Sequence, residues 1–345
     1  MSKLLKVVVL NDTRSEHHHG CSRVMNCIDH YLKDCSSTVV YSAVGDNWQQ
    51  SEKLKGEIVA ADLVIVNGEG TIHHNSSSGL ALVKVAQFAK KYGVKSYLIN
   101  MTYQANDSLY KKYLADFERI FVRESYSKAE LTGLGIDSEI VPDLTFSVIP
   151  DIHENLNAEN ILITCSVKSH VTTALEEKFS PDDNVIFSSI FNENKAAVEN
   201  ITVSTRLLNI MKNNTPAQMA KKIISSVTSR VSTTEQINWQ TQFTHPEYAD
   251  FIAQAKIVIC GRFHAMTICM NQGTNFLAIE SNSHKVSGTL TDIGLDINRF
   301  LVTPNMLTKD FVMSFEMTEN ERQLVKAYAD KAKTEISSMF AQILA

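Results

Sequence analysis

Arg262 and His264 stand two residues apart, directly after the apolar run AKIVIC. The run predicts a buried strand, and residues 265–271 have the pattern of a helix. The first N–H groups of a helix are unpaired and its dipole is positive there, so such a turn suits an anion. A lone histidine here would often be structural. With an arginine beside it, the pattern favours a site for a phosphate or a carboxylate.

A second polar turn, NGEGTIHH, follows the apolar run DLVIV. Gly68 and Gly70 permit a tight turn and close approach of the backbone to a ligand, although their spacing matches no standard nucleotide-binding motif. Glu69 lies between them, and a carboxylate at the mouth of a sheet is a candidate general base. His73 and His74 follow in the same turn and are candidate substrate contacts.

Two further stretches carry side chains that are either structural or functional. The segment NDTRSEHHHG holds His17, His18 and His19, which cannot all face one point. It predicts either an exposed polar loop or a site role for one histidine, with His18 as the substrate-binding candidate. Arg123 ends the apolar run RIFVRE, where it either pairs with Glu124 or faces a ligand. Because burial of an arginine is costly, we predict that Arg123 lies at a cleft.

The elements that position these turns follow from the alternation of short apolar strands and helical patterns along the chain. Repeated βα order predicts parallel sheets with helices on both faces. Residues 148–157 are polar and weakly periodic, and the alternation restarts beyond them, with one helix predicted at 216–230. We therefore predict an α/β protein of two doubly wound Rossmann-like domains, residues 1–150 and 158–315, facing each other across a ligand cleft.

The end of the sequence predicts a long amphipathic helix. Thr318 and Glu321 form a capping-box pattern, and apolar residues recur on one face from Leu324 to Ile343. We predict that this segment, residues 318–345, packs across the junction of the two domains.

Composition describes an ordinary globular protein. Of 345 residues, 44% are hydrophobic and 21% are charged, and the net charge of −5 argues against a nucleic-acid-binding surface. No apolar stretch approaches the roughly 20 residues of a membrane helix, and the N-terminal apolar run is too short for a signal sequence. We expect a cytoplasmic protein, peripheral to a membrane at most. The six cysteines form no CxxC pair, and we expect core thiols rather than disulfides or metal ligands.

These stretches, in this order, resemble the polysaccharide pyruvyl transferase family. The resemblance covers the glycine-rich turn after DLVIV, then VRESYSKAELTGLGIDSEIVPDLTF, then CGRFHAMTICMNQGTNFLAIESNSHKVSGTLTDIGL. Members are similar to glycosyltransferases of the two-Rossmann, GT-B type, and they transfer the enolpyruvyl group of phosphoenolpyruvate to a sugar as a ketal. The resemblance places the donor-binding arginines at Arg123 and Arg262 and the essential histidine at His264.

The resemblance implies an acceptor side in the first domain and a donor side in the second. Arg262 would bind the phosphate with N–H groups near Ala265, and Arg123 the carboxylate, since a guanidinium binds an oxyanion through two hydrogen bonds. His264 would donate a proton to the methylene carbon. The candidate acceptors of the sugar hydroxyl proton are Glu69, His73, His74 and His18. No metal or other cofactor is required, because arginines and the helix dipole meet the phosphate charge.

Two rival functions are compatible with the same residues. A glycosyltransferase of this fold would bind a nucleotide sugar in the second domain, with Glu280 on the ribose and Arg262 and Lys285 on the diphosphate. A catalytically silent sugar- or nucleotide-binding protein is the other rival, although a protein that only binds needs no poised acid such as His264. Either enzyme would act on a glycan or a lipid-linked sugar.

Overall fold

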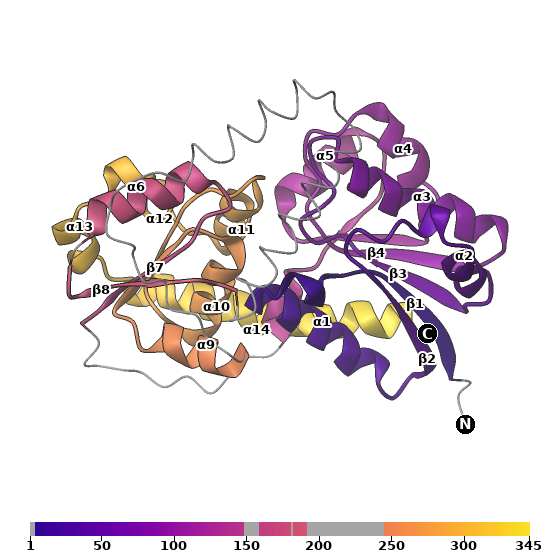
Figure 1. The fold of residues 1–345 in the computed structure, drawn as a ribbon, viewed down its shortest axis with the longest axis horizontal. Coiled ribbons are helices and arrows are strands. Elements are labelled where there is room, and N and C mark those ends of the chain that lie inside the picture. Colours follow the sequence, from indigo (N-terminus) through magenta and orange to yellow (C-terminus); the bar gives the residue numbers. More distant parts are fainter. Residues whose placement is uncertain (1–3, 148–158, 181, 192–244) are drawn as a thin grey trace, which may run out of the picture.

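The computed structural model describes residues 4–147, 159–180, 182–191 and 245–345. Figure 1 shows two lobes, each a β-sheet with helices packed on it, and the last helix of the chain lying across both. The α/β fold predicted from the sequence is confirmed. The predicted boundary at 148–157 and the predicted helix at 216–230 both lie outside the described residues.

The first lobe contains a six-stranded sheet of order β2-β1-β3-β4-β5-β6, with all neighbours parallel. Its strands are β1 (Leu5–Asp12), β2 (Ser36–Ala43), β3 (Leu63–Asn67), β4 (Lys95–Met101), β5 (Arg119–Val122) and β6 (Glu139–Ile140). The chain leaves β1 for β2 on one side and returns to β3 on the other. The carboxyl ends of β1 and β3 therefore form the switch point at which doubly wound sheets bind ligands.

Helices cover both faces of this sheet. They are η1 (Thr13–Glu16), α1 (His19–Leu32), α2 (Glu52–Val59), α3 (Ser77–Lys91), α4 (Ser108–Leu114) and α5 (Ser125–Gly133), and the short η3 (Leu144–Ser147) follows β6. The strands are apolar because both faces are covered, and Val7, Val8 and Val9 of β1 are completely buried.

The second lobe contains a four-stranded parallel sheet of order β10-β9-β7-β8. Its strands are β7 (Ile161–Thr164), β8 (Val185–Ser188), β9 (Ile257–Cys260) and β10 (Phe276–Ala278). Its helices are α6 (Ser169–Phe179), α9 (His245–Ala253), α10 (Phe263–Gln272), α11 (Lys285–Ile293), α12 (Ile297–Phe300) and α13 (Lys309–Ser314). Here the switch point lies between β7 and β9, so α6 and α10 begin there.

Helix α14 (Glu319–Ile343) spans the two lobes and begins with the capping box of Thr318 and Glu321. Near its start, Arg322 donates to the carbonyl of Gly273 in the second lobe at 3.0 Å. Near its end, the Phe340 ring stacks on Tyr31 of α1 at 4.4 Å. One hydrophobic cluster runs from the first sheet through α14 into the second lobe, so the junction is a packed core.

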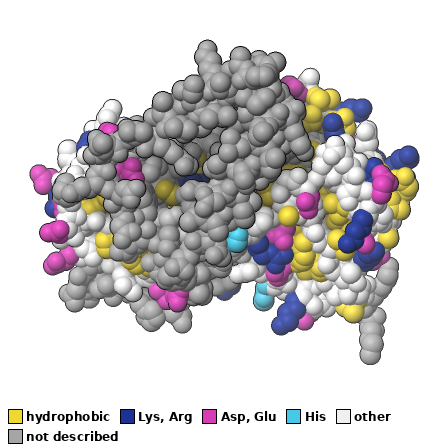
Figure 2. Space-filling model, in the orientation of Figure 1, with side chains coloured by type: hydrophobic (Ala, Val, Ile, Leu, Met, Phe, Trp, Pro, Cys, Tyr) yellow, Lys and Arg dark blue, Asp and Glu magenta, His cyan; other side chains and the backbone are white. Residues whose placement is uncertain are grey.

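The surface charges, the hydrophobicity of the helices and the state of the cysteines relate to the expectations from composition. Figure 2 shows basic and acidic side chains interspersed on the coloured part of the right-hand, first lobe. No helix in the described ranges is both long and apolar enough to cross a membrane. All six cysteines are free, and all but Cys35 are buried.

Candidate active site

The two switch points meet where α1 of the first lobe faces α10 of the second. The N–H of His19 donates to the carbonyl of Ile190 at 3.0 Å, which joins the lobes through their backbones. A β-carbon at Gly20 would lie 2.2 Å from the ring of His264. Only glycine therefore leaves room for this histidine to cross the junction.

His264 lies in the first turn of α10 and points between two carboxylates of the first lobe. Its Nε2 is 3.3 Å from Oε1 of Glu69 and 3.6 Å from Oδ2 of Asp143. The residue is 7% exposed. An imidazole between two carboxylates is placed to carry and transfer a proton.

Glu69 is held in one orientation on the turn after β3. Its Oε2 accepts a hydrogen bond from Thr13 Oγ1 at 3.0 Å and one from Asn67 Nδ2 at 3.4 Å. Its Oε1 accepts from the Cys21 thiol at 3.1 Å. The predicted carboxylate at the mouth of the sheet is thus buried, and its free lone pairs face His264.

The glycines of this turn are required by the backbone, and the histidines after them lie at its edge. Gly70 has a φ of +65°, and a β-carbon on Gly68 would lie 2.8 Å from that of Met101. His73 and His74 place their Nδ1 atoms 3.0 Å apart, and His74 is exposed. Burial lowers the pKa of His73 to about 4, so this imidazole is neutral at pH 7.

Arg123 is buried by its neighbours, contrary to the expectation of a guanidinium open to the cleft. It is 1% exposed; Nη1 donates to Asp143 at 2.8 Å, and Nε and Nη2 donate to Thr102 Oγ1 at 3.2 and 2.7 Å. Its partner is not Glu124, which instead accepts from the N–H of Ser127 and caps α5. A buried guanidinium needs partners for its N–H groups, and these neighbours supply them.

Asp143, which the sequence reasoning did not single out, connects Arg123 with His264. Its Oδ1 accepts from the N–H and the hydroxyl of Thr145 at 3.0 and 2.7 Å. Burial opposes ionisation, but His264, Arg123 and Thr145 outweigh it and hold the pKa of this carboxyl well below its usual range. The only signal in the sequence was its position directly after a predicted strand.

Arg262 is the N-cap residue of α10, and no described side chain caps this helix. Its Nε donates to Cys165 Sγ at 3.3 Å, and its guanidinium lies 4.7 Å from the centroid of the Phe191 ring. Within the described ranges it has no carboxylate partner in an ion pair. The N–H of Ala265 donates to the Arg262 carbonyl, so an anion would meet the N–H groups before Ala265.

Lys285 is buried at the start of α11 and, like Arg123, lies near the Phe263 ring. The Phe263 centroid lies 5.9 Å from Lys285 Nζ and 4.9 Å from the Arg123 guanidinium. Nζ donates to Asn282 Oδ1 at 3.0 Å. Burial, with Arg123 nearby, lowers the pKa of Lys285 to about 7. This amine therefore changes charge near neutral pH.

Helices α6, α10 and α11 all begin at this edge of the second sheet, and no described side chain caps any of them. Their N-cap residues are Lys168, Arg262 and His284. Lys168 Nζ contacts the backbone carbonyl of Glu280 at 3.4 Å, and the Glu280 carboxylate accepts from the N–H of Ser281. Open helix N-termini beside basic side chains form a surface suited to an anion.

His18 reaches the site, and its two neighbours do not. The Nδ1 of His18 accepts from the N–H of Gly20 at 3.1 Å, and its ring lies edge-on to His264 at 5.3 Å. Burial and the nearby His264 hold the pKa of His18 well below its usual range. His19 is buried against Tyr248, and His17 ends η1 with a φ of 53°. The alternative of an exposed loop is thus wrong for His18 and His19.

A family model described as polysaccharide pyruvyl transferase matches residues 18–283. No curated protein matches the chain. A putative UDP-N-acetylglucosamine 2-epimerase from Listeria monocytogenes is similar in structure, with a TM-score of 0.54, 11% identity and coverage of 99% of this chain and 96% of that one. Anabaena HepE in complex with UDP gives a TM-score of 0.50, 11% identity and coverage of 98% and 100%. At these identities the likeness shows the fold alone, which is GT-B-like.

Proposed function

Because the chain belongs to the polysaccharide pyruvyl transferase family, we propose that it transfers the pyruvyl group of phosphoenolpyruvate to a glycan or a lipid-linked sugar. The product is a ketal on two sugar hydroxyls, and phosphate is released. The observation that carries this proposal is His264, which faces the Glu69 carboxylate at 3.3 Å beside the open N-terminus of α10.

The donor would lie against the second lobe. Arg262, which forms no ion pair among the described residues, and the first N–H groups of α10, which no described side chain caps, would bind its phosphate. Lys285 and the start of α11 would bind its carboxylate. Arg123, whose guanidinium is already hydrogen-bonded, would instead position Asp143 and Phe263.

The reaction would begin with proton transfer from His264 to the methylene carbon, which makes C2 electrophilic. A sugar hydroxyl then bonds to C2, and its proton passes to Glu69. A second hydroxyl replaces the phosphate at C2, and its proton leaves with the phosphate. Since Glu69 lies 3.3 Å from His264, it can return the first proton to the imidazole for another turnover. These steps require no metal or cofactor.

A glycosyltransferase is the second candidate, and one observation favours it. Glu280 lies two residues after β10, and its backbone carbonyl contacts Lys168 at the start of α6, a place where a carboxylate could accept hydrogen bonds from a ribose. Arg262 and Lys285 would then bind the diphosphate. The structurally similar Anabaena HepE is in complex with UDP.

Calorimetric titration separates the two candidates. We expect heat on adding phosphoenolpyruvate, no heat with UDP-, GDP- or CMP-sugars, and phosphate release only when an acceptor glycan is present. Binding of a nucleotide sugar without binding of phosphoenolpyruvate would replace the pyruvyl transferase with the glycosyltransferase.

A further inference from the structure

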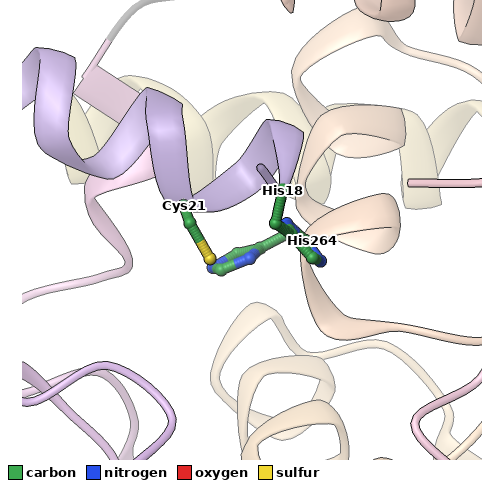
Figure 3. Close-up of side chains that lie close together, drawn as sticks. All are labelled: His18, Cys21 and His264. Atoms are coloured by element: carbon green, nitrogen blue, oxygen red, sulfur yellow. The ribbon is translucent and has the colours of Figure 1, made fainter. Parts of the chain in front are cut away.

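The side chains of two histidines and one cysteine lie close together at the junction of the lobes. The closest ligand atoms of His18, Cys21 and His264 all lie within 4.8 Å of one another, and all three residues are buried. Figure 3 shows Cys21 on the first turns of α1 with its sulfur directed at the His264 ring. This cluster could not be predicted from the sequence, because Cys21 and His264 lie far apart in the chain and belong to different lobes.

Glu69 adds an oxygen at the spacing of a metal site. Its Oε1 is 3.1 Å from Cys21 Sγ and 3.3 Å from His264 Nε2. With zinc bonds of about 2.0 Å to nitrogen and oxygen and about 2.3 Å to sulfur, ligand atoms at tetrahedral corners lie roughly 3.3–3.6 Å apart. The two distances from Glu69 Oε1 are therefore close to this spacing, and the ligand atoms of Cys21 and His264 lie within 4.8 Å of each other.

The histidine nitrogen that faces this space is available to a ligand. His264 Nε2 is buried, and within the described residues it has no hydrogen bond of acceptable geometry. The Cys21 sulfur lies 3.1 Å from a carboxylate oxygen of Glu69 and 3.7 Å from one of Glu16. This negative charge would favour a bound cation, which would displace the thiol proton on binding.

We propose that Cys21, His264 and Glu69 bind Zn²⁺, with His18 as the fourth ligand. His18 would exchange its hydrogen bond from the Gly20 N–H for the bond to the metal. The ligands come from α1 and the β3 turn of one lobe and from α10 of the other, so the ion joins the lobes. A bound ion also takes the Nε2 lone pair of His264. If His264 is the proton donor of the proposed function, the metal-bound and proton-donating states exclude each other.

Cobalt substitution tests the site without any sugar or phosphoenolpyruvate. We expect chelator-treated protein to bind one Co²⁺ with a thiolate-to-cobalt charge-transfer band, and equimolar Zn²⁺ to displace it. Cys21→Ser removes the band. The matched control Cys35→Ser, which changes a partly exposed thiol just after the same helix, retains it. His18→Gln, which can still accept the Gly20 N–H, keeps the band and weakens binding by more than about tenfold.

Two results would overturn the proposal: no charge-transfer band in the wild-type protein, or an unchanged band in Cys21→Ser. If Cys21→Ser does not fold, an unchanged Co²⁺ affinity in His18→Gln would overturn the four-ligand site. None of these outcomes bears on phosphoenolpyruvate binding, which the calorimetric test measures separately.

Discussion

The two lobes treat the N-termini of their helices differently. In the first lobe, α1 to α5 each begin with a side chain that accepts a backbone hydrogen bond, and these caps are His18, Ser51, Ser76, Asp107 and Glu124. In the second lobe, no described side chain caps α6, α10 or α11, which follow strands of its sheet. A cap is worth about 1 kcal/mol, so the second lobe forgoes stability at one edge.

The difference is local to that edge. Helices α12, α13 and α14 lie away from it, and Asp296, Thr308 and Thr318 cap them. Open helix termini therefore gather where Arg262 and Lys285 also lie. The comparison teaches that the first lobe satisfies its helix N-termini with its own side chains, whereas this edge of the second lobe leaves backbone N–H groups uncapped, which suits an anion.

The largest expected effect comes from His264, the side chain that the second lobe extends to the first. His264→Ala is expected to cut turnover by about 10²–10⁴-fold, the usual worth of a positioned general acid, and to leave donor binding nearly intact. Phosphate release and calorimetric titration with phosphoenolpyruvate measure the two quantities. A parallel loss of binding would show that His264 is a donor ligand rather than the acid.

Arg262→Lys tests the open edge directly. The ammonium keeps the charge but cannot reproduce a two-pronged contact, so the donor is expected to bind about 10- to 100-fold more weakly, the value of one charge-assisted hydrogen bond. Arg299→Lys is the matched control, because Arg299 pairs with Glu321 near the start of α14. Equal dissociation constants for Arg262→Lys and the wild type would remove Arg262 from the donor site.

The charge of Lys285 should make donor binding depend on pH. The lowered pKa of about 7 means that the amine is charged below pH 7 and loses its charge as the pH rises. Affinity for phosphoenolpyruvate is expected to fall by up to about tenfold between pH 6 and pH 8. Lys285→Arg stays charged and should flatten this part of the profile. The same decline in wild type and variant would assign the titration to another group.

The smallest effects on stability and binding are expected from removing a helix cap in the first lobe and adding one in the second. Ser76→Ala is expected to lower the free energy of unfolding by about 1 kcal/mol and to leave donor binding unchanged. Lys168→Asp should add a cap to α6 and stabilise the protein by a similar amount, while weakening donor binding. Denaturant titration and calorimetry measure both. Donor binding unaffected by Lys168→Asp would exclude the start of α6 from the site.

The fold was predictable because most strands are continuous apolar runs. A strand covered by helices on both faces of its sheet needs apolar side chains at every position, not only at alternate ones. Five of the described helices were not predicted, namely α2, α6, α11 and the short α12 and α13. In α2, only Leu54 and Ile58 are buried, and polar residues outnumber them. Helix α6 contains two adjacent threonines, which are weak helix formers. In α11, Gly288 lies against Glu124 of the first lobe, so contact between lobes rather than local pattern supports the helix.

The sequence allowed prediction of the individual turns that carry site residues, but not of the contacts between those turns. Glu69 and His264 each follow a strand, and their neighbours in the sequence, the glycines around Glu69 and Arg262 beside His264, marked them as candidates. The pairing of Arg123 with Asp143 depends on the neighbouring strand ends of β5 and β6, and a sequence does not show which carboxylate an arginine meets. The Cys21 contact depends on how the turn after β3 packs on α1.

If the proposed function holds, the placement of His264 against Gly20 would also protect the donor. His264 belongs to one lobe and Glu69 to the other, so any separation of the lobes breaks up this pair. Phosphoenolpyruvate held on the second lobe alone would then meet water without a base to activate it. In the proposed reaction the architecture itself would suppress wasteful hydrolysis, since the pair is complete only while both halves of the molecule are in contact.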